Sequence, residues 1–311
     1  MNCFRKSFHV AIVALIASLV TGCNKSSETG TTGILVSTDW LQEHLHDPDL
    51  VVLHAGTAEL FDSIHIPGAR LITPESFTIS TDSLRNELPP KDSIEILLRE
   101  AGINKESRIL LYHETSRLLT RTARIFVTLD HVGLGGQTFL LDGGFPAWQE
   151  EQRECSGEAS EFSYGNLDLV DTKKVVIGAS ELDRQRWNEE IVVLDVRSDE
   201  EYYGTPGTED APAEGGHIEG AYFLPYQAKL MDERTHYFRS APELRKIFKK
   251  AGVDPEKISV IYCGSGIRAS VSYVAAVHLG YPVLLYDGSY EEWTRLGLPL
   301  TGPVAIPDTL E

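Results

Sequence analysis

The chain has 311 residues and a formal net charge of −18 at pH 7, with 46 acidic against 28 basic side chains. This length is enough for two domains of ordinary size, each with its own hydrophobic core. Nucleic-acid binding depends on clustered lysine and arginine side chains, so the acidic balance argues against a nucleic-acid partner.

The first 22 residues have the pattern of an export signal. Arg5 and Lys6 supply positive charge at the start, and the apolar stretch 9–20 is too short to span a bilayer. The sequence LVTGC that ends at Cys23 is similar to the cleavage box of bacterial lipoproteins, in which small residues precede an obligatory cysteine. The resemblance implies that residues 1–22 are removed and that Cys23 becomes a lipidated N-terminus.

A lipid on Cys23 would hold the chain at a membrane surface without a spanning helix. Residues 23–33 are polar and rich in glycine, serine and threonine, which predicts a flexible tether. We therefore expect a lipid anchor on the extracytoplasmic side of the cell envelope, and Asn24 favours the outer membrane if the source is Gram-negative. A plain secretory signal cleaved near Gly22 stays open as the alternative.

The rest of the chain contains the same pattern twice. Three segments of the first half return in the second half in the same order: 49–72 as 190–225, 108–114 as 259–265, and 129–148 as 277–293. Two copies of this length indicate duplicated domains rather than a solenoid.

Within each copy, short runs of valine, isoleucine and leucine alternate with helical segments. Apolar runs of this length are typical of strands buried on both faces, as in a parallel sheet with helices on either side. The predicted strands are 50–55, 108–113, 138–143, 191–196, 259–264 and 283–288. The prediction is an α/β fold with two domains, each a parallel sheet flanked by helices on both faces, at 34–152 and 175–304 with a linker at 153–174.

Serine and glycine residues mark the ends of several predicted helices. Ser37 and Ser180 precede the helical segments 39–45 and 181–187, where a serine hydroxyl can cap free amides. Gly280 is expected to end the helix that follows Cys263.

The four cysteines do not suggest a disulfide framework. Cys3 leaves with the signal, Cys23 is the lipid site, and Cys155 lies in the predicted linker. Only Cys263 lies in a sequence that looks organised around it. A disulfide between Cys155 and Cys263 in an oxidising compartment stays open as a minor alternative.

The stretch VIYCGSGIRAS predicts a reactive cysteine. Cys263 ends an apolar strand, Gly264 and Gly266 allow a tight turn, and Arg268 precedes a helical run. The amides of such a loop converge on its centre, and the helix N-terminus adds positive potential there. An anion at that centre is stabilised, and the thiolate is the nucleophilic form of cysteine.

The duplicated layout and this loop resemble the tandem rhodanese family of sulfurtransferases. The resemblance is carried by HIPGA, GGHIEGA, LDVR, CGSGIRAS and YDGSYEEW, and it covers the chain from Ile34 to Pro303. It implies a catalytic domain at 175–304, in which Cys263 takes a sulfane sulfur from a small-molecule donor as a persulfide. The sulfur then passes to a thiophilic acceptor, such as cyanide, a thiol or a protein, with no metal or organic cofactor. The substrate-binding residues it implies are Gly264, Ser265, Gly266, Ile267, Arg268 and Arg197.

The spacing within the loop favours sulfur transfer over phosphate chemistry. Related phosphatases and arsenate reductases have five residues between the cysteine and the arginine, whereas only four separate Cys263 from Arg268. The first copy has His113 in the cysteine position, and its loop is three residues longer and carries Arg117, Arg121 and Arg124. The resemblance implies a non-catalytic domain at 34–152 that walls the cleft, and we interpret His113 as structural.

The sequence favours thiosulfate as donor but leaves mercaptopyruvate open. Ser265 matches the serine that polarises mercaptopyruvate in the family, and Arg197 matches the first of two arginines that grip its carboxylate. The second arginine position falls on Asp210, and the catalytic Asp and His expected in the segments LITPES and RNELPP are missing. Arg268 resembles the arginine of single-domain rhodaneses that accept thiosulfate, a dianion suited to a fixed cation.

Two other readings of the chain stay open beside the enzyme. A membrane-tethered module could bind or relay persulfides without turnover, and the loop could act on a phosphate ester. The repeated His65 and His217 and the repeated Trp148 and Trp293 are interpreted as structural, because both copies have them and only one copy has the nucleophile. Asp195 is either the partner of a loop arginine or a strand-end capping carboxylate.

Overall fold

The computed structural model describes residues 33–170, 172–204, 215–232, 235 and 237–302. The predicted export signal, Cys23 and Asp210 lie outside these residues. No helix within the described ranges has both the length and the apolar character needed to cross a membrane.

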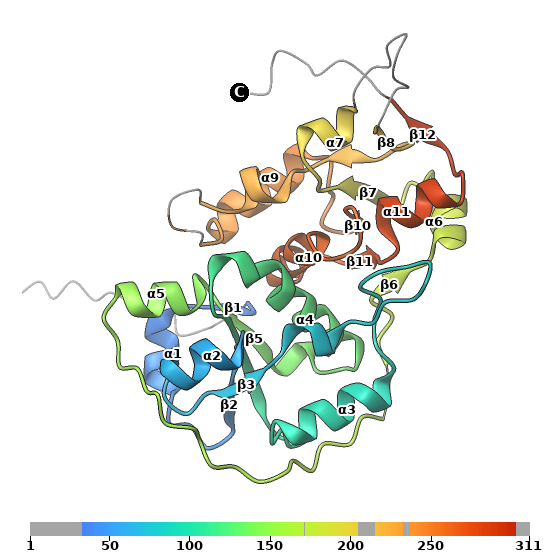
Figure 1. Ribbon diagram of the computed structural model, residues 1–311. Helices are drawn as coiled ribbons and strands as arrows, with labels where there is room; N and C mark the ends of the chain where they lie inside the picture. The colour runs from blue at the N-terminus through green and yellow to red at the C-terminus, as the bar shows by residue number, and fades with distance from the viewer. Residues whose placement is uncertain (1–32, 171, 205–214, 233–234, 236, 303–311) are drawn as a thin grey trace, which may run out of the picture. The chain divides into compact units, whose positions relative to one another are not determined.

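The first copy forms a five-stranded parallel sheet in the order β1-β5-β4-β2-β3 (Figure 1). Its core strand β4 is buried in five of six residues, as a strand covered on both faces must be. In chain order the elements are β1 (Leu35–Val36), α1 (Thr38–His44), β2 (Leu50–Ala55), α2 (Ala58–Ser63), β3 (Arg70–Ile72), η1 (Pro74–Phe77), α3 (Lys91–Glu100), β4 (Arg108–His113), η2 (Ser116–Leu118), α4 (Leu119–His131), η3 (Gly135–Gln137), β5 (Thr138–Leu141) and α5 (Gly144–Glu150).

The second copy repeats this sheet as β6-β11-β10-β7-β9, again parallel, and adds the antiparallel pair β8 and β12. The central strands β7 and β10 bring the ends of two apolar runs to the same edge of the sheet. In chain order the elements are β6 (Val176–Ile177), α6 (Ala179–Gln185), β7 (Ile191–Asp195), α7 (Asp199–Tyr203), β8 (His217–Ile218), β9 (Tyr222–Phe223), α8 (Tyr226–Leu230), α9 (Ala241–Lys250), β10 (Ile258–Tyr262), α10 (Ala269–Leu279), β11 (Val283–Tyr286), α11 (Ser289–Arg295) and β12 (Leu300–Thr301).

The predicted fold of two α/β domains with parallel sheets is confirmed. Of the three predicted helix ends, those at Ser37 and Gly280 are confirmed. The Ser37 hydroxyl accepts the Trp40 amide, and Gly280 ends α10 in the left-handed conformation with φ 77°. The prediction for Ser180 is wrong, because α6 begins at Ala179, two residues before the predicted start, and Gly178 occupies the cap position with extended backbone.

The predicted linker, 153–174, packs against the first domain. Its described residues form no helix or strand, but Leu167 and Leu169 are buried. The Gly165 amide donates to the Arg99 carbonyl at 2.7 Å, and the Arg99 guanidinium donates to the Leu167 carbonyl at 2.5 Å. Cys155 and Cys263 are free thiols, so the disulfide considered as a minor alternative is absent.

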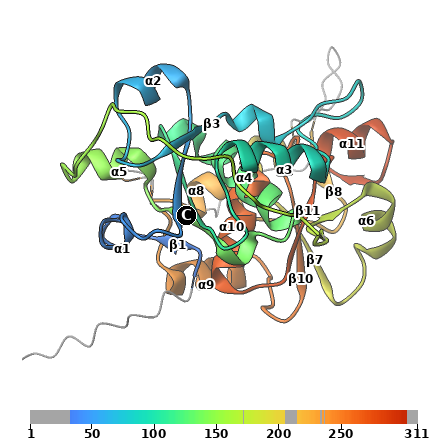
Figure 2. The same cartoon turned by 90° about the horizontal axis from the view of Figure 1, so that it is seen from below.

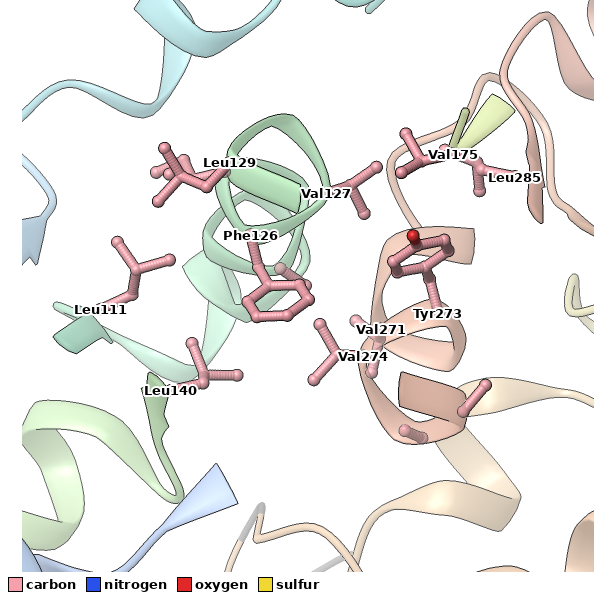
Figure 3. Close-up of a cluster of buried hydrophobic side chains, with 14 of the residues drawn as sticks. Leu111, Phe126, Val127, Leu129, Leu140, Val175, Val271, Tyr273, Val274 and Leu285 are labelled. Carbon is pink, nitrogen blue, oxygen red and sulfur yellow. The ribbon is translucent and has the colours of Figure 1, made fainter. Parts of the chain in front are cut away.

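The two domains meet through a continuous apolar core at α4 and α10, which lie side by side (Figures 1 and 2). Phe126 and Val127 of α4 face Val271 and Val274 of α10 in this core (Figure 3). At one end of the contact the Tyr273 hydroxyl donates to the carboxylate of Asp130 at 2.6 Å. The helix that follows the cysteine loop is therefore held from the first domain as well as from its own sheet.

Truncating Phe126 tests how far the two domains depend on this contact. We expect Phe126→Ala to lower the free energy of unfolding by roughly 3–5 kcal/mol, because the ring is fully buried and leaves a cavity between the domains. Ile96→Ala, at an α3 side chain that is 52% exposed, should change it by less than about 0.5 kcal/mol. Urea unfolding of both variants measures this, and equal losses would contradict the role of the α4–α10 contact.

Candidate active site

Cys263 lies directly after β10, at the sheet edge where the carboxyl ends of parallel strands commonly form binding sites. Its side chain is 1% exposed. The hydroxyl of Ser289 accepts the amides of Cys263 at 3.2 Å and Gly266 at 3.0 Å, and donates to the Tyr286 carbonyl at 2.8 Å. The start and the middle of the loop are thus tied to one buried hydroxyl.

Four other amides of the loop have no acceptor among the described residues. These amides belong to Gly264, Ser265, Ile267 and Arg268. Unpaired amides next to a helix N-terminus form an anion-binding concavity. Unpaired amides are what a loop that binds a thiolate, a persulfide or an oxyanion needs, and the binding itself stays a prediction.

Gly266 is required by the backbone and by its surroundings. It has φ 82°, and a Cβ atom there would lie 2.8 Å from Oδ1 of Asp287 and 2.9 Å from its carbonyl oxygen. At Gly264 a Cβ atom would lie 3.1 Å from Nη2 of Arg268. Both glycines of the predicted tight turn therefore allow close approach of a neighbouring group.

Ser289 is a functional candidate that the sequence pattern did not single out. It has φ 52°, a strained conformation for a residue with a side chain, and it is fully buried. The matching residue of the first copy is Gly144, with φ 59°. A Cβ atom on Gly144 would lie 2.5 Å from the ring of His113, which is buried at the end of β4. Comparing DGG with DGS between the copies is the signal that could have found Ser289.

The segment RNELPP reaches the cysteine loop from the first domain. The side-chain amide of Asn86 donates to the Ser265 carbonyl and to the Ser265 hydroxyl, each at 3.2 Å. An asparagine side chain does not ionise near neutral pH, so it cannot act as a general acid or base as a histidine or a carboxylic acid can. The predicted substrate residue Ser265 therefore has a polar partner without acid–base capacity.

A buried ion pair supports the loop from behind. Arg124 of α4, which is 1% exposed, binds Asp287 through Nη1 at 2.5 Å and Nη2 at 2.9 Å. The same guanidinium donates to the Asn86 carbonyl, and Asp287 accepts the Leu88 amide at 3.2 Å. Since Asp287 also contacts Gly266, first-domain residues determine where the loop lies.

Arg268 is paired with a carboxylate instead of being a free cation. Its guanidinium binds Glu201 through two hydrogen bonds of 2.6 Å. Burial acts to raise the pKa of Glu201, but Arg268 and the Ser198 amide outweigh it and lower that pKa to about 2. The Glu201 carboxylate in turn raises the pKa of Arg268. This pairing reduces the net positive charge that Arg268 offers to a donor.

Arg197 is also paired. It is 3% exposed, binds both carboxylate oxygens of Asp195 and donates to the Gly216 carbonyl at 2.6 Å. Its guanidinium stacks 3.8 Å from the ring centre of Tyr290. Both interpretations of Asp195 fit the structure: it pairs with the Arg197 guanidinium, and at the end of β7 its Oδ1 also accepts the Arg197 backbone amide at 3.0 Å. The role of Arg197 in donor binding stays a prediction.

A cavity of about 870 Å³ lies beside the loop. Burial raises the pKa of Tyr226 in its wall. Arg268 is the residue of the cysteine loop that lines the cavity. Both domains contribute to the lining: Ser116, Arg117, Leu119 and Thr120 from the first, and 196–199, 225–228, Met231, Asp232 and Arg268 from the second. Within the described chain, no cluster of three histidine, cysteine, aspartate or glutamate side chains could hold a metal.

The repeated aromatic residues and histidines make matching contacts in the two copies. The hydroxyls of Tyr112 and Tyr262 accept backbone amides in equivalent turns, at 3.3 and 3.0 Å. His65 and His217 each bind a backbone carbonyl and stack on an aromatic ring. The repeated Trp148 and Trp293 are fully buried. These contacts support the structural interpretation of the repeated residues.

The model of the rhodanese-like domain matches the chain twice, at residues 37–151 and 178–296. The chain belongs to the rhodanese family. It is a tandem rhodanese-domain protein related to thiosulfate and 3-mercaptopyruvate sulfurtransferases.

This rhodanese aligns with several known proteins over nearly the whole length of those proteins. A sulfur carrier protein, TtuD, of Thermus thermophilus is 32% identical and aligns over 86% of this chain and 96% of its own. A thiosulfate sulfurtransferase of Azotobacter vinelandii is 28% identical, over 81% and 91% of the two chains. The crystal structure of SseA, a 3-mercaptopyruvate sulfurtransferase of Escherichia coli, has a TM-score of 0.69 at 26% identity and covers 83% of this chain and 99% of its own.

Glu87 adds a titratable group to the domain contact. Burial raises the pKa of its carboxyl to about 7, the charge of Asp287 adds to the shift and that of Arg124 opposes it. Its Oε1 is buried and has no hydrogen-bond partner among the described residues. The folded protein therefore holds a proton on Glu87 in a range of pH where the unfolded chain has released it.

This proton predicts the pH dependence of stability. Between the ordinary pKa of 4.5 and about 7 the folded state binds more protons, so the contribution of Glu87 to the free energy of unfolding falls as the pH rises. We expect Glu87→Gln to flatten this decline relative to the wild type. Urea unfolding at intervals from about pH 5 to about pH 8 measures it, and parallel profiles for the two proteins would contradict a raised pKa.

Proposed function

We propose that this rhodanese-type sulfurtransferase takes a sulfane sulfur from thiosulfate onto Cys263 and passes it to a thiophilic acceptor such as cyanide or a thiol. The observation that carries the proposal is the set of unpaired loop amides around Cys263, at the N-terminus of the eleven-residue helix α10. Four amides without an acceptor among the described residues, together with a helix terminus, can stabilise an anion without any cofactor.

The chemistry needs only a stabilised sulfur anion. The Cys263 thiolate attacks the outer sulfur of thiosulfate, the sulfur–sulfur bond of the donor breaks, and sulfite leaves with the electron pair. The acceptor then attacks the outer sulfur of the persulfide, and the Cys263 thiolate is restored as the leaving group. The loop amides bind negative charge at each stage, because that charge stays on sulfur atoms next to the loop.

The partner of Ser265 favours thiosulfate over mercaptopyruvate. When a sulfur leaves mercaptopyruvate, the carbon product is an enolate, which needs a proton, whereas sulfite leaves as a stable anion. Asn86 holds the Ser265 hydroxyl but cannot supply a proton to it. Because Arg268 is paired with Glu201, the loop amides rather than that guanidinium supply most of the positive potential for the thiosulfate dianion.

Replacing Cys263 tests the persulfide. With thiosulfate and cyanide, we expect Cys263→Ser to lose all measurable turnover, and mass spectrometry of the wild type after exposure to thiosulfate should find one added sulfur atom on Cys263. Cys155→Ser, at the other free thiol, serves as the control and should keep both signals. Equal turnover by wild type and Cys263→Ser would remove the enzymatic proposal.

The choice of donor predicts a ratio of rates. We expect kcat/KM for thiosulfate to exceed that for mercaptopyruvate by about tenfold or more, because general acid catalysis is commonly worth at least that factor and Asn86 cannot provide it. Steady-state kinetics with cyanide as the common acceptor measures both values. A higher kcat/KM for mercaptopyruvate would refute thiosulfate as the preferred donor.

A second candidate is a persulfide carrier that delivers sulfur to a protein. It is supported by the 32% identity to the sulfur carrier protein of Thermus thermophilus. A carrier would acquire the added sulfur on Cys263 but release it slowly to cyanide. Comparing the rate of persulfide formation with the rate of turnover therefore distinguishes the carrier from the enzyme.

We also propose that the protein is anchored by a lipid on Cys23 at the extracytoplasmic side of the cell envelope, on the sequence pattern alone. In a bacterial host, the full chain should sediment with membranes and incorporate labelled palmitate. Cys23→Ala should abolish the label and move the protein to the soluble envelope fraction. Asn24→Ala, next to the lipid site, should keep the palmitate label and still sediment with membranes. Wild-type protein without palmitate would contradict the anchor.

A further inference from the structure

Helix α9 carries a cluster of positive charge on an otherwise acidic chain. Segment 239–257, which contains α9, has six basic side chains against three acidic ones, whereas the whole chain has 28 basic against 46 acidic. Leu244 and Phe248 form the buried side of the helix. Four exposed basic side chains on the other side, the α9 basic face, form no ion pair with a described residue: Arg245, Lys246, Lys249 and Lys250.

The helix dipole explains only half of this face. Lys249 and Lys250 lie in the last turn of α9, where positive charge complements the dipole. Arg245 and Lys246 lie before that turn, and the effect of the dipole falls off within one turn. Solubility does not require these cations either, because the net charge of −18 already supplies it. The α9 basic face is therefore suited to a partner that is rich in negative charge.

The equivalent helix of the first domain, α3, differs in both charge and surroundings. It precedes β4 as α9 precedes β10, and it has two basic and three acidic side chains. Its Lys91 ammonium group donates to the Leu169 carbonyl, and its Arg99 guanidinium donates to the Leu167 carbonyl, each at 2.5 Å. The linker thus uses the cations of α3, whereas those of α9 are left to solvent. The duplicated scaffold does not by itself require a cationic helix at this place.

The chain enters the first domain beside the end of α10, which packs against α9. The Leu35 amide at the start of β1 donates to Nδ1 of His278, in the last turn of α10, at 3.4 Å. A Cβ atom on Gly33 would lie 2.2 Å from the same nitrogen. Directly after α10, the ring of Tyr281 lies 5.9 Å from the ring of Phe248 on α9. The first described residues and the C-terminal ends of α9 and α10 therefore lie close together.

This region lies at the edge of the second sheet opposite the cysteine loop. The chain passes from the end of α9 to the start of β10, and Cys263 follows the end of β10. From the loop the chain returns through the eleven residues of α10, a length of about 16 Å, to reach His278. The α9 basic face and the candidate nucleophile are thus separated by the length of a strand and a helix.

We propose that the α9 basic face docks on the anionic headgroups of the membrane to which the lipid on Cys23 anchors the protein. This inference rests on the proposed anchor. Nine residues separate Cys23 from Gly33, and a flexible chain of that length spans about 17 Å on average. A folded chain of this size is roughly 50 Å wide. The anchor therefore keeps the side of the protein next to Gly33 near the headgroups, where each basic side chain is attracted to anionic lipid.

The anchor and the α9 basic face act on different properties. The net charge of −18 opposes an anionic surface, so the basic face by itself does not hold the protein there. A lipid holds the protein but leaves its orientation free, and a basic patch is a common second signal. Tyr222, which is 54% exposed, lies next to Gly252 just past α9, and tyrosine is enriched at the level of the headgroups. Docking would turn the cysteine loop away from the bilayer.

Lysine labelling on vesicles tests the docking. The lipid-bearing wild type is bound to phosphatidylcholine vesicles with or without phosphatidylglycerol, and an amine-reactive reagent is read out by mass spectrometry. We expect Lys246, Lys249 and Lys250 to react at least about tenfold more slowly on the anionic vesicles, because docking excludes the reagent. Lys229, an exposed side chain of α8, should react equally on both. High salt should remove the protection, because it screens the attraction.

Two variants with the same change in net charge separate the α9 basic face from charge in general. Each basic side chain at the surface favours docking about fivefold, so Lys246→Gln/Lys250→Gln should weaken it roughly 25-fold. Lys249 of this variant should then react at nearly equal rates on both kinds of vesicle. Arg121→Gln/Arg295→Gln, which removes two exposed arginines from α4 and α11, should keep Lys249 protected. Equal loss in both variants, or equal labelling of the wild type on both kinds of vesicle, would overturn the docking.

The anchor and the docking fail in different ways. If the wild type carries no lipid on Cys23, the anchor fails, and cosedimentation of that protein with anionic vesicles decides the docking. Binding that only Lys246→Gln/Lys250→Gln loses would support the α9 basic face, and no binding by the wild type would overturn it. Protection of Lys249 in host membranes but not on protein-free anionic vesicles would also overturn it, and would indicate an acidic protein as the partner.

Discussion

The structure depends on the burial of one helix, α10. Nine of its eleven residues are buried, and apolar side chains lie on all of its sides, so it has no face suited to water. Strands β10 and β11 and helices α8 and α9 of its own domain cover part of this surface, and α4 of the first domain covers another part. Because the cysteine loop leads directly into α10, the same burial that holds the domains together sets the position of the candidate nucleophile.

Duplication kept the scaffold and changed the chemistry at two positions. The tyrosine near the end of the central strand, the histidine of the turn and the tryptophan of the last helix make equivalent contacts in both copies. At the loop itself, the first copy has His113 packed against Gly144, where the second has Cys263 and Ser289. A glycine with positive φ leaves room for the imidazole ring, whereas a strained serine at the same backbone position supplies the hydroxyl that gathers two loop amides. The first copy therefore has the same fold but lacks the cysteine and the serine of this loop.

Charge around the cavity is arranged so that most arginines support the structure. Arg124, Arg197 and Arg268 are bound to Asp287, Asp195 and Glu201, and each pair joins segments that are separated in the sequence or steadies the strand end beside the loop. Breaking one of the buried pairs would leave an uncompensated charge, which is costly in a medium that water does not reach. In the proposed reaction, backbone amides, which need no counter-charge, bind the sulfur anions.

The sequence by itself determined the strands, the duplication, the cysteine loop and the helix after it, because apolar periodicity and glycine positions act over a few residues. Gly266 and Gly280 adopt the left-handed conformations that their place in the pattern required. Tertiary structure alone decided that Asn86 meets Ser265, that Arg124 meets Asp287, and that the cation predicted at Arg268 is neutralised by Glu201. Those partners are 67 to 179 residues apart in the chain. No local pattern records such pairs, because they form only when two separately specified domains bury a shared helix between them.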